Sequence, residues 1–127
     1  MNNLMDKVEE VVSGNTDVLN RGLLIVDDNQ FLKKQVEAYI NARGKTYRWF
    51  TGDISSPAFK EMLSGSHILV FDGLNYNKRA ITGLLYGSMA DPNSEFDGQY
   101  ILFGTDIIKN AKLRSCFSMW TGNNFPK

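Results

Sequence analysis

The chain has 127 residues, 43% of them hydrophobic and 22% charged, and its 14 basic and 14 acidic side chains give a formal net charge of zero. This length fits one domain with a core of its own, and the composition excludes an intrinsically disordered chain. The neutral balance argues against attraction of the whole molecule to nucleic acid or to an anionic membrane, and it leaves a local basic patch open.

The cysteine and histidine content limits the metal chemistry. Because Cys116 is the single cysteine and His67 the single histidine, the sequence excludes an intrachain disulfide and a multi-cysteine zinc or iron–sulfur site. The polar, acidic N-terminus does not predict a signal peptide, and no apolar run reaches the length of a membrane span. We therefore expect a cytoplasmic protein without membrane contact.

Apolar spacing predicts a helix at the start of the chain. Within residues 2–13, one helical face carries Leu4, Val8, Val11 and Val12. We expect this helix to pack on the edge of the domain, and a helix that docks on a partner protein is the alternative.

The next segments read as a strand followed by a helix. Residues 22–26 form a short continuous apolar run, which is typical of a strand buried on both faces. Asp27, Asp28 and Asn29 are good N-cap residues, and a helix is predicted to follow them and to end at Gly44.

The remaining segments continue this alternation and complete the predicted fold. Strands are predicted at 46–50, 67–71, 99–103 and 116–120, and helices at 57–63, 78–89 and around 106–115. Alternating buried strands and amphipathic helices are typical of a mainly parallel sheet covered by helices on both faces. We expect a five-stranded, three-layer α/β sandwich in one domain over residues 1–127, with an N-terminal helix and connector at 1–21 and a loose tail at 121–127.

Acidic and hydroxyl residues follow three of the predicted strands. Asp27 and Asp28 follow the first strand, Asp72 follows the third, and Thr105 and Asp106 follow the fourth. Ligands of parallel sheets bind at the carboxyl ends of the strands. These carboxylates could share a Mg²⁺ ion, which prefers a few carboxylates and water. The alternative is that Asp27 and Asp28 cap the helix and that Asp72 lies in a polar turn.

A phosphate-binding loop is not found after the first strand. The usual loop is rich in glycine and carries a lysine and a hydroxyl residue, whereas this chain reads DDNQFLKK from residue 27. Two carboxylates beside a helix N-terminus would repel phosphate, and no glycine-rich dinucleotide motif occurs either. We therefore expect no bound nucleotide and no nucleotide hydrolysis.

No residue pattern predicts a nucleophilic catalytic site. His67 lies at the start of a strand, away from the strand ends where ligands bind, and is expected to be structural. Cys116 opens an apolar segment and is expected to be a buried, unreactive thiol. Lys109, Lys112 and Arg114 form a small basic cluster, expected to be a solvated face, with contact to nucleic acid as the alternative.

Two family resemblances follow from these segments, and both cover most of residues 22–120. LLIVDDNQFLKKQVEAYI resembles the first strand, the acid-rich replacement of the phosphate loop and the next helix of AAA+ modules that do not bind ATP, as in the delta subunit of bacterial sliding-clamp loaders. HILVFDGLN is similar to the Walker B strand segment of that family. The resemblance implies a protein-docking apolar pair before that strand, and Met62-Leu63 is the nearest match.

The second resemblance is to the receiver domain of response regulators. LLIVDDN is similar to the first strand and acidic pair of that family. This resemblance implies Asp72 as phosphoacceptor, Asp27 and Asp28 as Mg²⁺ ligands, and Thr105 as the hydroxyl after the fourth strand. The lysine-proline pair that should follow the fifth strand is absent.

The short link between Thr105 and the fifth strand favours the AAA+ resemblance, since a receiver has a longer helix there. Strand order separates the two families, because the AAA+ order places the first strand between the fourth and fifth, and the receiver order places it between the second and third. We expect a non-catalytic module that binds a protein partner through Met62 and Leu63 in a replication or other nucleic-acid machine, without a cofactor. A switch that depends on phosphorylation or Mg²⁺ is the alternative.

Overall fold

A computed structural model of the chain describes residues 4–13, 22–27, 29–52, 68–90 and 99–122. These residues form one five-stranded sheet in which every neighbouring pair of strands is parallel. The strands are β1 (Gly22–Val26), β2 (Tyr47–Thr51), β3 (Ile68–Asp72), β4 (Gln99–Gly104) and β5 (Phe117–Thr121). The described helices are α1 (Leu4–Ser13), α2 (Gln30–Ala42), α4 (Arg79–Ala90) and α5 (Ala111–Arg114).

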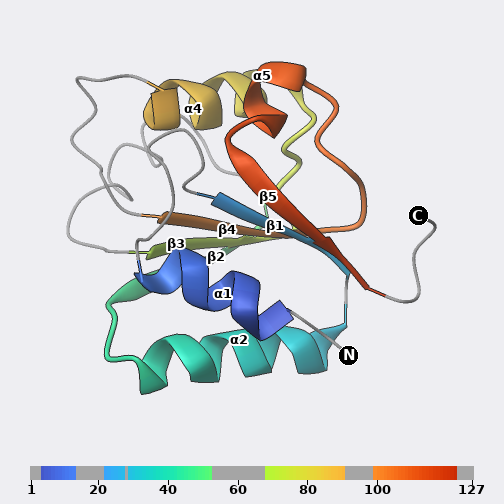
Figure 1. Cartoon of the computed structure of the whole chain (residues 1–127). Helices are drawn as coiled ribbons and strands as arrows, with labels where there is room; N and C mark the ends of the chain where they lie inside the picture. Colours follow the sequence, from blue (N-terminus) through green and yellow to red (C-terminus); the bar gives the residue numbers. More distant parts are fainter. Residues whose placement is uncertain (1–3, 14–21, 28, 53–67, 91–98, 123–127) are drawn as a thin grey trace.

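The helices cover both faces of the sheet, so the predicted three-layer α/β architecture is confirmed. α1 and α2 lie on one face, and α4 and α5 lie on the other (Figure 1). The strand order is β2-β3-β4-β1-β5, which places β1 between β4 and β5. This is the order that the AAA+ resemblance implied, and it differs from the receiver order.

The alternation of side chains along the strands divides the core into two layers. In β1, Leu24 and Val26 face the layer under α4 and α5, whereas Leu23 and Ile25 face the layer under α1 and α2. β3 and β4 alternate in the same way, because successive side chains of a strand point to opposite faces. Both faces are buried, which explains why these strands read as continuous apolar runs.

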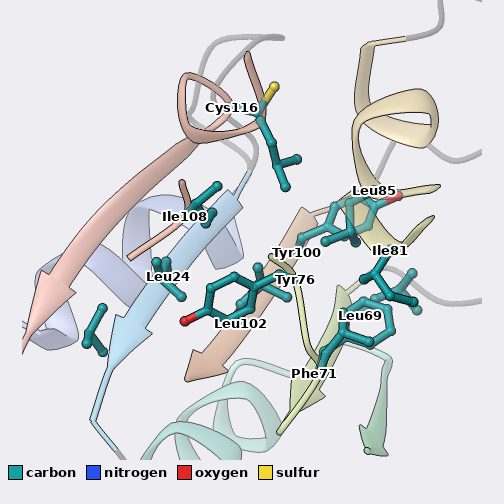
Figure 2. Packing of buried hydrophobic residues seen from close by; sticks show 13 residues of the cluster. Leu24, Leu69, Phe71, Tyr76, Ile81, Leu85, Tyr100, Leu102, Ile108 and Cys116 are labelled. Carbon is teal, nitrogen blue, oxygen red and sulfur yellow. The ribbon is translucent and has the colours of Figure 1, made fainter. Parts of the chain in front are cut away.

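The layer under α4 and α5 is built from aromatic and branched side chains. Ile81 and Leu85 from α4 pack against Leu69, Phe71 and their neighbours on the sheet (Figure 2). Figure 2 also shows Cys116 at the margin of this layer, where its side chain is 3% exposed, so the predicted burial of this thiol is confirmed.

The apolar face of α1 is part of the other core layer. Leu4, Val8 and Val12 are fully buried and Val11 is 2% exposed, in the same cluster as Val36 and Ile40 of α2. This packing leaves none of the predicted apolar face free to dock on a partner.

The ends of the helices follow local capping rules, with one correction. Asn29 caps α2, since its side-chain oxygen accepts a hydrogen bond from the Phe31 amide at 2.8 Å. Gly44, with φ of 70°, follows the end of this helix. The helix predicted around 106–115 is wrong in length, because Asn110 caps α5 and only Ala111–Arg114 is helical. The helix predicted at 57–63 lies outside the described residues.

Candidate functional site at the carboxyl edge of the sheet

The carboxyl ends of β1, β3 and β4 meet at one edge of the sheet. The parallel register sets Val26 beside Gly104 and Asp72 beside Phe103, so the ends of these strands lie level. Asp27, Asp72 and Thr105 all line one cavity of about 440 Å³ at this edge. The structure therefore brings these three sequence-predicted site residues together, and Asp28 lies outside the described residues.

The Asp27 carboxylate is held in the turn between β1 and α2. Its side chain is buried, and Oδ1 accepts a hydrogen bond from the Asn29 amide at 3.0 Å. The backbone of Gly122 passes so close to the other carboxylate oxygen that any side chain at position 122 would overlap it. Asp27 therefore contacts both the turn between β1 and α2 and the backbone that follows β5.

The Asp72 carboxylate forms an ion pair with a lysine of α2. Lys33 Nζ lies 2.8 Å from Asp72 Oδ1, and the two side chains are 10% and 19% exposed. Screening by water is weak for a pair this buried, so the ammonium neutralises the carboxylate. The pair also fastens α2 to the end of β3.

These partners limit what the cavity can bind. Asp27 is engaged by the Asn29 amide and Asp72 by the Lys33 ammonium. A Mg²⁺ ion at Asp72 would share this carboxylate with the Lys33 ammonium 2.8 Å from Oδ1, and the two positive charges would repel each other. Among the described residues, no group of three histidine, cysteine, aspartate or glutamate side chains could hold a metal ion.

Tyr76 forms one wall of the cavity. Its hydroxyl donates a hydrogen bond to the Asp106 carbonyl and accepts one from the Asp106 amide at 3.3 Å. Burial raises the pKa of the Tyr76 hydroxyl above its ordinary value of 10, and the negative charge of Asp106 adds to this, while the hydrogen bond to the Asp106 backbone acts in the opposite direction. The ring lies against Gly104, where a Cβ atom would overlap it.

Asn77 connects the two loops that border the cavity. Its amide nitrogen donates to the Ile107 carbonyl at 2.9 Å, and its amide oxygen accepts from the Lys109 amide at 2.9 Å. This pair of bonds fixes the segment after β4 to the segment after β3. Thr105 and Asp106 are held on this fixed segment and are exposed.

Two residues of the site were missed from the sequence. Lys33 was not identified as buried, although it shares a helical face with Val36 and Ile40, and a lysine on a buried face signals a paired charge. Tyr76 lay in a segment without periodicity, and nothing local predicts its contact with Asp106.

The other sequence-predicted residues differ in position. Asp106 and Lys109 also line the cavity, whereas Lys112 and Arg114 are exposed and do not. Met62, Leu63 and His67 lie outside the described residues. The Arg114 guanidinium donates to the Ile108 carbonyl at 3.1 Å, so it stabilises the connection that leads into α5.

The comparisons with known proteins assign no role to this site, and neither does the search for membrane-spanning helices. None of the helices in the described ranges combines the length and the apolar character that crossing a bilayer requires. No family model, curated protein or solved structure matches this chain.

Proposed function

We propose that the chain is a non-catalytic protein-interaction module with an AAA+-like fold that lacks the phosphate-binding loop, and that it acts in or on a replication or other nucleic-acid machine. The observation that carries this proposal is the junction between β1 and α2. There the side chain of Asn29 caps the helix, and the lysine of its first turns, Lys33, is paired with Asp72.

Both groups that would bind a phosphate at this junction are already engaged. The Phe31 amide at the start of α2 donates to Asn29, and the Lys33 ammonium contacts a carboxylate 2.8 Å away. The buried Asp27 carboxylate adds negative charge beside the helix N-terminus, where a phosphate would have to approach. This arrangement favours a scaffold that does not take up ATP or GTP.

The strand order supports the AAA+-like part of the proposal. β1 lies between β4 and β5, so the junction is at the carboxyl edge of the sheet, where ligands of open α/β sheets bind. A fold of this kind without its phosphate chemistry is compatible with recognition of a protein. The burial of the Cys116 thiol is compatible with a reducing, cytoplasmic setting.

The proposed partner contact has two parts. Met62 and Leu63 remain the proposed apolar anchors. Phe31, on the first turn of α2, is the most exposed large hydrophobic side chain among the described residues, at 66%. An exposed aromatic side chain beside a carboxyl-edge cavity suits an anchor for a protein partner.

Calorimetry and affinity capture test the proposal together. Titration of the purified chain with Mg²⁺-ATP is expected to give no binding heat. Affinity capture from the source organism, compared among the wild type, Phe31→Asp and Met62→Asp, is expected to lose a specific partner in at least one variant. Gln35→Asp, at an exposed position of the same helix, is the matched control. Tight ATP binding, or an unchanged set of captured proteins in both variants, would contradict the proposal.

A receiver-like switch is the second candidate, and one observation favours it. Asp27, Asp72 and Thr105 line the same cavity, as a phosphoacceptor site requires. NMR titration with Mg²⁺ and a small acyl phosphate distinguishes the two candidates. Chemical shift changes confined to the amides around Asp27 and Asp72 would support the switch. Unchanged spectra would rule out the switch and leave the interaction module as the proposed function.

A further inference from the structure

Figure 1 shows α4 and α5 on the face of the sheet opposite α1 and α2. Residues of α4, of α5 and of the segment before α5 line a second hollow on this face. It has a volume of about 430 Å³. We call it the α4–α5 groove, and the lining residues that carry the argument are Arg79, Gly83, Tyr86, Lys109, Asn110 and Lys112. It meets the carboxyl-edge cavity at Asn77 and Lys109, which line both.

The α4–α5 groove concentrates positive charge in a molecule whose formal net charge is zero. Arg79, Lys109 and Lys112 line it, and no carboxylate among the described residues does. Lys109 lies 3.7 Å from Asp106, but its side chain is 71% exposed, and an ion pair this exposed contributes little. Within the described ranges, neither Arg79 nor Lys112 has an ion-pair partner. The groove therefore has charge available for an anionic ligand.

The α4 side of the groove carries a partly exposed aromatic side chain, Tyr86. Tyr86 is 36% exposed, and Gly83 and Gly87 flank it on the same helix. A Cβ atom at either glycine would meet nothing within 4 Å, so packing does not require glycine at these positions. Glycine is less favourable than alanine inside a helix. The surface of α4 therefore carries no side chain at these two positions near Tyr86 in sequence.

We propose that the α4–α5 groove binds single-stranded nucleic acid. The phosphodiester groups would contact Arg79, Lys109 and Lys112, and one base would stack on Tyr86. Single strands are bound by this combination of a basic groove and an aromatic ring. An acidic peptide would contact the three basic side chains but would not need an exposed aromatic ring. The bases of a duplex are already stacked on each other, so they cannot stack on Tyr86.

This inference is independent of the proposed docking function. It concerns the face of the sheet under α4 and α5, whereas Phe31 lies on α2, on the other face. The test below uses the purified chain alone, without ATP or a protein partner. Failure of one proposal therefore leaves the other standing.

Fluorescence anisotropy with a labelled oligothymidylate of about twelve nucleotides tests the proposal at about 50 mM salt. The wild type is expected to bind the single strand at least about tenfold more tightly than a duplex of the same length, because only the single strand offers free base faces. Lys109→Gln/Lys112→Gln is expected to weaken binding at least about tenfold. The same variant should reduce the slope of log affinity against log salt by about 1.4, which corresponds to two lost phosphate contacts.

Two further variants separate a specific site from general charge attraction. Lys34→Gln/Lys45→Gln removes the same charge elsewhere on the chain and is expected to bind within about twofold of the wild type. Tyr86→Leu should weaken oligonucleotide binding about tenfold with an unchanged salt slope, and should leave heparin binding unaltered. Circular dichroism checks that each variant is folded.

Three results would overturn the proposal: no binding of the oligonucleotide, equal losses in the two double-lysine variants, or wild-type affinity in folded Tyr86→Leu.

Discussion

The ammonium of Lys33 lies 2.8 Å from a carboxylate oxygen of Asp72, and this ion pair joins α2 to the end of β3. The two side chains are 10% and 19% exposed, so both charges have lost most of their hydration. The pair must recover that desolvation cost through its own attraction, and a buried pair does so only in part. Removing one partner destabilises the protein further, because the remaining charge stays desolvated and no longer has an opposite charge beside it.

A double-mutant cycle on this pair gives the first prediction. Lys33→Met and Asp72→Asn are each expected to lower the free energy of unfolding by about 2 kcal/mol, less than for a sealed pair because the adjoining cavity admits water. The double variant should lose less than the sum of the two, with a coupling of about 1–2 kcal/mol. Urea unfolding followed by circular dichroism measures all four proteins.

Lys34→Met is the control for that cycle, since Lys34 is the exposed neighbour on the same helix. It should change stability by less than about 0.5 kcal/mol. Equal stabilities for Lys33→Met and Lys34→Met would show that the ion pair contributes nothing to the fold.

The second prediction concerns Gly104 at the end of β4. A Cβ atom there would overlap the Tyr76 ring and hydroxyl, so the ring must move in Gly104→Ala. The expected cost is about 1–3 kcal/mol, the usual range for forcing an extra methyl group into a packed site. Gly87→Ala is the matched control, because its Cβ atom meets nothing and alanine favours a helix; it should be neutral or stabilising by up to about 1 kcal/mol. Thermal unfolding should shift to lower temperature in Gly104→Ala and should stay unchanged or rise in Gly87→Ala.

The third prediction follows from the raised pKa of Tyr76. Because the pKa is higher in the folded protein than in the unfolded chain, the folded state holds this proton more tightly. The stability that it contributes is complete below the unfolded value of about 10 and is lost as the pH rises through the folded value. Unfolding free energies measured from about pH 8 to about pH 11 should therefore fall at the alkaline end.

Tyr76→Phe tests the assignment of that alkaline loss. The variant should be less stable at neutral pH by about 1–2 kcal/mol, because the Asp106 carbonyl loses its donor. It should also lose less stability above pH 10 than the wild type does. Tyr76 accounts for only part of the stability lost at alkaline pH, since hydrogen bonds to Glu9 and Glu37 raise the pKa values of Tyr39 and Tyr47 as well. Parallel pH curves for the two proteins would refute the role of Tyr76.

The buried strands of the fold could be predicted closely from sequence. β1 coincides with the predicted range, the bounds of β3 lie one residue later than predicted, and β4 is one residue longer. The agreement is close because a strand buried on both faces has to be continuously apolar. The strand order could not be derived in this way. Pairing of β1 with β4 and β5 depends on contacts between distant parts of the chain, and local apolar patterns carry no information on them.

The location of the candidate site could be predicted from the sequence, but the contacts among its side chains could not. Asp27, Asp72 and Thr105 could be placed at one edge because parallel strands end together. The partner of Asp72 could not be inferred from spacing alone, since Lys33 reaches it from another element. The overestimated helix around 106–115 has a similar cause, because Tyr76 and Asn77 bind the backbone of this segment and hold it in a non-helical form.

The fourth prediction tests how Asn77 orders the segment before α5. Asn77→Ala removes the donor to Ile107 and the acceptor for the Lys109 amide, so stability should fall by about 1–2 kcal/mol. The Lys109 amide should also exchange with solvent at least about tenfold faster, measured by hydrogen exchange and NMR. Asn77→Asp keeps the acceptor and loses the donor, so the Lys109 amide should stay protected while stability still falls. Lys78→Ala, at the exposed neighbouring position, should change neither quantity. Unchanged Lys109 exchange in Asn77→Ala would mean that the segment is ordered by its contact with Tyr76 instead.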